Sequence, residues 1–122
     1  MLVIVNCRTL YSYPWIAYLL GDLQITNNKV VVCGTLSDYD NGKVENAKAA
    51  FGAVDYEICQ DHNLRSHQEM LRLLMQRHDA TKRNCLLVSD IPAEQQAGAS
   101  LGLVCIQPLL FEYHVKDLVD DE

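Results

Sequence analysis

The stretch from Val30 to Gly52 reads VVVCGTLSDYDNGKVENAKAAFG and predicts one strand followed by one helix. Its first residues are apolar and mostly β-branched, as in buried strands, and they end at a glycine. Further along, Val44, Ala47 and Phe51 recur at helical spacing, and the glycine that follows them is suited to end a helix. The segment therefore predicts one βα unit.

The same alternation extends over the rest of the chain. Further strands are expected at residues 2–5, 54–59, 85–88 and 103–106. Strands that alternate with single helices form parallel sheets covered by helices on both faces. Because such crossovers are right-handed, the expected fold is a five-stranded, doubly wound α/β sandwich of three layers, (βα)5, in a single domain over residues 1–122.

The expected helices carry distinct start signals. Pro14 suits the first turn of a helix whose apolar stripe runs from Ile16 to Leu23. Ser66 and Glu69 are spaced as a capping box at the start of a later helix, and Pro92 opens another.

Composition narrows the class of protein. The chain is 49% hydrophobic and 21% charged, which excludes a disordered chain, a fibre and a disulfide scaffold. Its net charge of −6 argues against direct contact with nucleic acid, and the weak basic cluster between Arg65 and Arg83 is interpreted as a solvated helix face. The longest apolar run, Trp15 to Leu20, is too short to cross a membrane, and no signal peptide is expected after Met1.

Five cysteines are spread along the chain, and the first four, at positions 7, 33, 59 and 85, are each 26 residues apart. This period indicates one buried cysteine per strand in a reduced, cytoplasmic protein. Ligands spread in this way do not converge on zinc, and an odd number argues against a disulfide framework.

In open parallel sheets the functional site lies beyond the carboxyl ends of the strands. The residues expected at those ends are Asn6, Cys7, Gln60, Ser89 and Gln107. They lack the carboxylates that magnesium prefers, and no glycine-rich loop follows the first strand, so neither a metal nor a nucleotide cofactor is expected. Cys7 beside Arg8 is a candidate nucleophile without a nearby base, and the four histidines are expected on the surface.

These strand ends give the chain a resemblance to the receiver domains of bacterial response regulators over nearly its full length. Asp55-Tyr56-Glu57-Ile58-Cys59-Gln60 is similar to their third strand and places Gln60 at the phosphoacceptor position. Asn6 and Cys7 replace the metal-binding acids, and Gln107-Pro108 replaces a Lys-Pro pair. The resemblance implies a degenerate phosphoacceptor pocket, a pseudo-receiver, with strand order 2-1-3-4-5; Asp61 and Asp90 are possible substitute acids.

A second resemblance remains open. Residues 86–94, followed by 102–106, are similar to the last acidic motif of haloacid dehalogenase-like phosphatases, with Asp90 and Glu94 as the metal-side acids. In that family the nucleophilic acid and its partner would stand at Val5 and Cys7, so this alternative too implies lost catalysis. Its strand order would be 5-4-1-2-3 with a β-hairpin flap, for which the loop after the first strand is short. An active hydrolase using Asp61, Asp90 and Glu94 is a third hypothesis.

Both resemblances favour a regulatory protein-binding module over an enzyme. As a pseudo-receiver it would act in two-component signalling or transcription control, bound to a protein partner or a fused module, with a homodimer as one option. The expected interface lies on the closing helix, where the apolar residues outnumber those that a short helix can bury. Its candidate residues are Leu110, Phe111, Tyr113 and Leu118.

Overall fold

The computed structural model of the protein describes residues 1–25 and 27–113. Five strands are found: β1 (Leu2–Asn6), β2 (Lys29–Thr35), β3 (Asp55–Cys59), β4 (Cys85–Val88) and β5 (Val104–Ile106). The helices are α1 (Arg8–Ser12), α2 (Ile16–Ile25), α3 (Leu36–Asp40), α4 (Lys43–Phe51), α5 (Leu64–Arg77) and α6 (Pro92–Ser100), followed by the 3₁₀ helix η1 (Pro108–Leu110).

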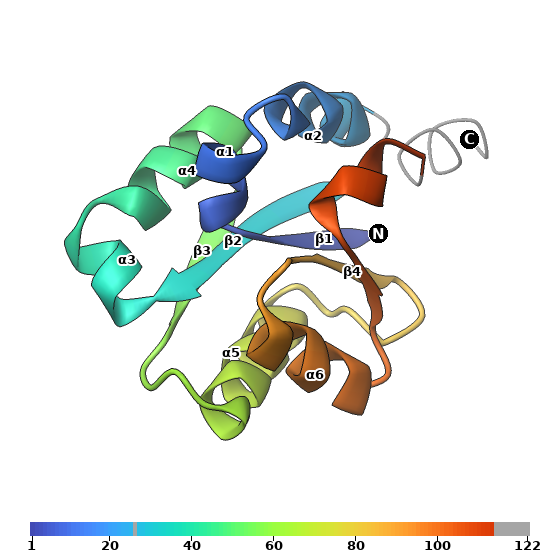
Figure 1. Ribbon diagram of the computed structural model, residues 1–122. Helices are drawn as coiled ribbons and strands as arrows, with labels where there is room; N and C mark the ends of the chain where they lie inside the picture. Colours follow the sequence, from blue (N-terminus) through green and yellow to red (C-terminus); the bar gives the residue numbers. More distant parts are fainter. Residues whose placement is uncertain (26, 114–122) are drawn as a thin grey trace.

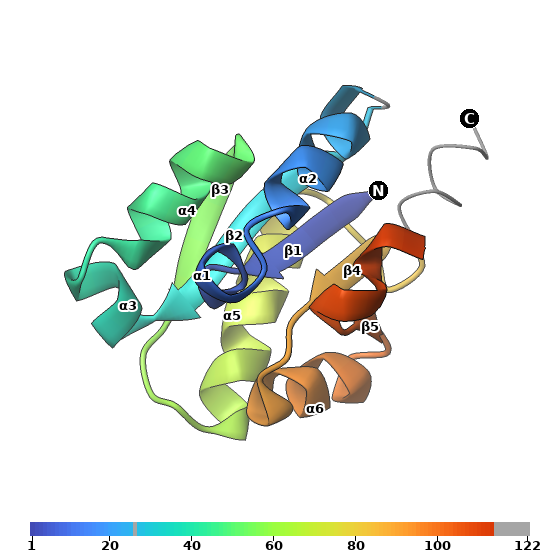
Figure 2. The ribbon, with the colours of Figure 1, turned by 45° about the horizontal axis from the view of Figure 1, so that its top comes forward.

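All neighbouring strands in the sheet are parallel, which confirms the predicted α/β class. The strand order is β3-β2-β1-β4-β5, so the predicted order 2-1-3-4-5 is wrong. The chain leaves β3 at one edge and crosses over β2 and β1 through α5 to reach β4 on the other side (Figure 2). As a result β1 pairs with both β2 and β4, and β3 is not its neighbour.

Helices cover both faces of the sheet, as Figure 1 shows, with α1, α2 and α4 on one side and α5 and α6 on the other. The alternation of side chains along β1 explains the two layers: Val3 and Val5 face the first layer, and Leu2 and Ile4 face the second. Because both faces are covered, the central strands are apolar throughout.

Several local predictions are confirmed, and others need correction. Gly52 ends α4 in the left-handed conformation, with φ of 65°. The expected capping box at Ser66 is wrong: Asn63 is the N-cap of α5, and its side chain accepts a hydrogen bond from the Ser66 amide. The short helices α1 and α3 were not predicted. None of the described helices is long and apolar enough to span a membrane.

Candidate functional site

The strand order decides which of the predicted site residues meet. Asn6 and Cys7 lie beside Ser89, because β1 pairs with β4. Gln60 follows β3, and the whole of β2 separates it from β1. Gln107 follows β5 at the other edge of the sheet, and both glutamines are exposed. The five residues therefore do not form one phosphoacceptor pocket.

A buried polar cluster occupies the carboxyl end of β1 on the face covered by α5 and α6. Asn6 Nδ2 donates to both carboxylate oxygens of Glu94, at 3.2 and 3.0 Å, and Cys33 Sγ lies 3.4 Å from Glu94 Oε1. His67 Nδ1 lies 3.4 Å from Glu94 Oε2, within ion-pair distance but without hydrogen-bond geometry. We call Asn6, Cys33, His67 and Glu94 the buried polar cluster.

The cluster takes Glu94 out of contact with solvent. Its side chain is 0% exposed and that of His67 is 1% exposed. A carboxylate without partners in such a place would cost several kcal/mol of folding free energy, which explains why three side chains surround it. Through these contacts Glu94 links α6 to β1 and β2.

His67 corrects the prediction that every histidine lies on the surface. Its Nε2 lies 3.2 Å from Nδ1 of the exposed His62, in the loop between β3 and α5. His67 shares the buried face of α5 with Met70, Leu71 and Leu74. That apolar stripe was the sequence signal that could have placed it inside.

Cys7, the candidate nucleophile, is fully buried. Burial raises the pKa of the Cys7 thiol to about 12, and the nearby carboxylates of Asp38 and Glu94 act in the same direction. Arg8 lowers the pKa, but its guanidinium is engaged with Asp38, with Nε 3.3 Å from Oδ2. Arg8 thus acts in the direction that a nucleophilic thiol needs, but burial and the two carboxylates outweigh it.

Asp38 lies next to Cys7, in the first turn of α3 at the carboxyl end of β2. Its side chain accepts a hydrogen bond from the Thr35 amide, and the Thr35 hydroxyl accepts one from the Asp38 amide, which forms a capping box at the start of α3. Burial raises the pKa of Asp38, but these hydrogen bonds and Arg8 outweigh it, so the pKa is lowered overall.

The three acids of the hydrolase hypothesis do not converge. Asp61 follows β3 and is exposed, whereas Asp90 follows β4, and two strands lie between them. Glu94 is enclosed in the buried polar cluster. Within residues 1–25 and 27–113, no group of three or more histidine, cysteine, aspartate or glutamate side chains could hold a metal ion.

Of the predicted interface residues that the structure describes, two are exposed and one is buried. Leu110 and Tyr113 are exposed, at 52% and 71%, but Phe111 is fully buried in the core between the sheet and α2. Phe111 is therefore not an interface anchor, because its side chain is already buried in the core cluster to which Ile16 and Leu20 also belong. Leu118 lies outside the described residues.

An exposed aromatic segment was missed. Four of the nine aromatic residues fall between positions 11 and 18. Tyr11, Trp15 and Tyr18 are exposed, Tyr18 at 82%, and Tyr13 packs edge-to-face against Trp15 with ring centroids 5.2 Å apart. Lys43 lies 5.7 Å from the centroid of the Tyr11 ring. We call Tyr11, Tyr13, Trp15 and Tyr18 the aromatic segment; its density in the sequence was a usable signal.

Comparisons with known proteins agree with the fold and give no function. No protein-family model matches the chain, and no curated protein does. A crystal structure of an uncharacterized protein from Corynebacterium glutamicum is similar, with a TM-score of 0.64 and 16% sequence identity. The match covers 98% of this chain and 92% of that protein. At this identity the likeness shows the shared fold alone.

Proposed function

We propose that this protein is a catalytically degenerate haloacid dehalogenase-like domain that acts by binding a protein partner. The proposal is based on the residues at the end of β1, where that family places its catalytic acids. Here Val5 and Cys7 occupy those positions, and both side chains are fully buried. A site of this kind offers neither a nucleophile nor a ligand for the metal.

The topology supports this choice between the two resemblances. Read from β5, the observed order is 5-4-1-2-3, the order expected for the haloacid dehalogenase-like alternative. Between β1 and β2 the described residues form only helices, so the flap of that family would be absent or reduced. The pseudo-receiver role in signalling stays a prediction from the sequence pattern, since a receiver would place β3 beside β1.

The aromatic segment supports a binding role. Tyrosine and tryptophan are enriched among the residues that contribute most to protein interfaces, because they bury large rigid surfaces. Trp15 and Tyr18 are three residues apart and both exposed near the start of α2, where a partner could cover them together. Leu110 and Tyr113 remain secondary candidates, for a partner or for a homodimer.

The thiols fit a reducing compartment. All five cysteines are free, and four of them are buried. Burial raises the pKa of Cys85 to about 12 and that of Cys59 to about 11, which slows their oxidation. We therefore propose that the protein works in the cytoplasm.

Two measurements test the proposed function. With Mg²⁺ present, the purified protein should not hydrolyse p-nitrophenyl phosphate, and Asp90→Asn should change nothing. Magnesium-dependent hydrolysis that Asp90→Asn abolishes would show an active enzyme.

The binding role requires a comparison of variants. Proteins that co-precipitate with the wild type from cells of its source should be lost with the double variant Trp15→Ser, Tyr18→Ser. The control Val54→Ser removes an exposed apolar side chain just before β3, away from both candidate surfaces. If the control loses the same proteins and the double variant keeps them, the aromatic segment is not the binding surface.

A further inference from the structure

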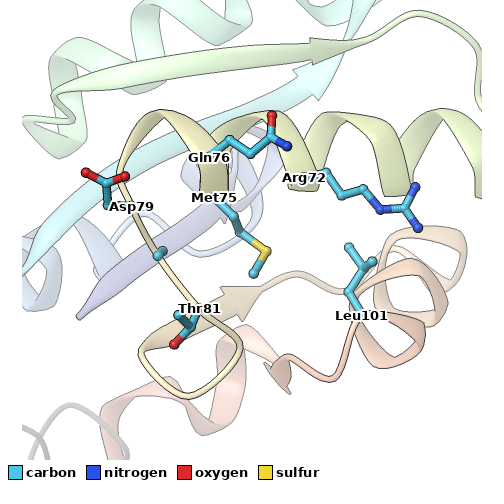
Figure 3. Close-up of a pocket in the computed structure, with 7 residues that line it drawn as sticks. Arg72, Met75, Gln76, Asp79, Thr81 and Leu101 are labelled. Carbon is cyan, nitrogen blue, oxygen red and sulfur yellow. The ribbon is translucent and has the colours of Figure 1, made fainter.

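A second surface, distinct from the aromatic segment, lies where α5 extends beyond the end of α6. It is a cleft of about 480 Å³ lined by the last turns of α5, the loop to β4 and Leu101. The cleft exists because α5 has 14 residues and α6 only 9. Figure 3 shows Met75 extending from α5 into the cleft, with Leu101 on the other side near the end of α6.

The charged groups around this cleft are unpaired. Arg72 and Asp79 lie at its opposite ends (Figure 3), and neither makes an ion pair or a side-chain hydrogen bond within the described residues. Elsewhere on α5, by contrast, Arg65 pairs with Glu69, and Arg77 pairs with Asp55 and Glu57. An apolar floor with unpaired charges of opposite sign at its two ends is a surface that is complementary to a dipolar partner.

The spacing indicates the shape of that partner. Arg72 and Met75 are three residues apart on one face of α5, and Asp79 lies in the loop just beyond the end of that helix, so a helix that packs along the end of α5 would meet all three. Arg72 lies about 8 Å before the end of α5 along the helix axis, and Asp79 lies beyond that end, so the partner's two charged residues would stand about two helical turns apart. The partner's apolar side chain would lie between its two charged ones, over Met75 and Leu101.

We propose that this cleft binds an amphipathic helix of a protein partner, with an acidic residue opposite Arg72, a basic residue opposite Asp79 and an apolar residue between them. The helix occupies the place beside α5 that α6 leaves open.

A pair of designed peptides tests the proposal. Each has about 20 residues, blocked ends and leucines at helical spacing. The first carries glutamate and lysine seven residues apart on the apolar face, and the second carries lysine at both positions. NMR titration of the labelled protein should show saturable shifts at residues 72–81 and 101 with the first peptide. The second should bind about tenfold more weakly.

Charge reversal at one position gives the decisive comparison. Arg72→Glu should reverse the preference, so that the peptide with two lysines becomes the better ligand. Asp79→Asn, which keeps a residue tolerant of the left-handed φ of 51°, should weaken the first peptide while leaving the melting temperature unchanged. Lys48→Glu on α4 alters the net charge equally and should have no effect.

Three results would overturn the proposal. They are shifts outside the cleft, equal binding of both peptides, and self-association of the wild type that Arg72→Glu abolishes, which would identify a second copy as the occupant. The double variant Trp15→Ser, Tyr18→Ser should bind the first peptide normally. The proposal for the cleft and the proposal for the aromatic segment can therefore be contradicted independently.

Discussion

The two ends of the contact between α5 and α6 differ in how their polar groups are used. At the carboxyl edge of the sheet, Glu94 and His67 are enclosed and surrounded by side chains of the same chain. At the far end, Arg72 and Asp79 flank an apolar cleft and pair with nothing in the described part of the chain. The first arrangement holds the fold together, and the second is available to another molecule.

This contrast indicates that a binding surface in such a fold can lie away from the carboxyl ends of the strands. The rule that sites lie at the carboxyl ends of parallel strands directs attention to β1 and β4. In this protein that edge is occupied by its own buried polar cluster. Arg72 and Asp79, which pair with nothing in the described part of the chain, lie at the opposite end, where surface composition is a better guide than topology.

The largest expected effect comes from breaking the buried polar cluster at Asn6. Asn6→Leu removes the amide that donates to both oxygens of Glu94, and it also removes the acceptor of the Arg8 amide hydrogen bond. The free energy of unfolding, measured with urea, should fall by about 3 kcal/mol or more, because a buried charge loses its partner. Gln107→Leu is the matched control at an exposed strand end. A loss below about 1 kcal/mol would mean that the cluster does not hold the fold.

A double variant sharpens the same comparison. Removing the charge as well, in Asn6→Leu with Glu94→Met, should recover about 2 kcal/mol of the free energy of unfolding, because no unpaired charge remains buried. The measurement is a double-mutant cycle with Glu94→Met as the second single variant. Additive losses would contradict a direct interaction between the two side chains.

The pH dependence of the free energy of unfolding should show the role of Asp38, at the start of α3 directly after β2. Asp38→Asn is expected to cost about 1 kcal/mol at neutral pH, the usual value for a helix cap. Because the pKa of Asp38 is lowered in the folded state, its contribution is present above 3.8, the ordinary value, and is lost as the pH falls through the folded pKa. The difference between wild type and variant should therefore shrink in acid, as followed by thermal unfolding. A difference that grows below pH 3.8 would reverse the assigned direction.

The smallest effect is expected at the open cleft. Arg72→Glu should change the free energy of unfolding by less than about 0.5 kcal/mol, since Arg72 is exposed and makes no ion pair within the described residues. Urea unfolding under the conditions used for Asn6→Leu gives a direct comparison. A loss comparable to that of Asn6→Leu would mean that the cleft charges are structural after all.

The fold class could be predicted from the sequence, but the strand order could not. Apolar β-branched runs such as Val30 to Cys33 identify strands locally, and right-handed crossovers make the sheet parallel. The same local pattern is compatible with β3 beside β1 or at the edge. The choice depends on whether α5 carries the chain back over β2 and β1, which is decided by packing across the whole sheet.

The site was less predictable than the fold. The positions of His67 and Glu94 on the inner faces of their helices follow from helical spacing with Met70 and Ala97. Their mutual contact does not, since Asn6 and Glu94 are 88 residues apart. The prediction from the receiver pattern failed at Gln60 because register along one strand does not determine which strand lies beside it.

Each strand carries a cysteine, either within it or next to it, so chemical modification of the thiols can report on the opening of individual strands. Cys7, Cys33, Cys59, Cys85 and Cys105 sample all five strands. With a pKa of about 12, about one Cys7 thiol in ten thousand is a thiolate at pH 8, even before burial blocks an alkylating reagent. The four buried thiols, those of Cys7, Cys33, Cys59 and Cys85, can therefore be alkylated only when their own strands open, so mass spectrometry of single-cysteine variants would time the opening of β1 to β4 strand by strand, with the partly exposed Cys105 as the fast reference.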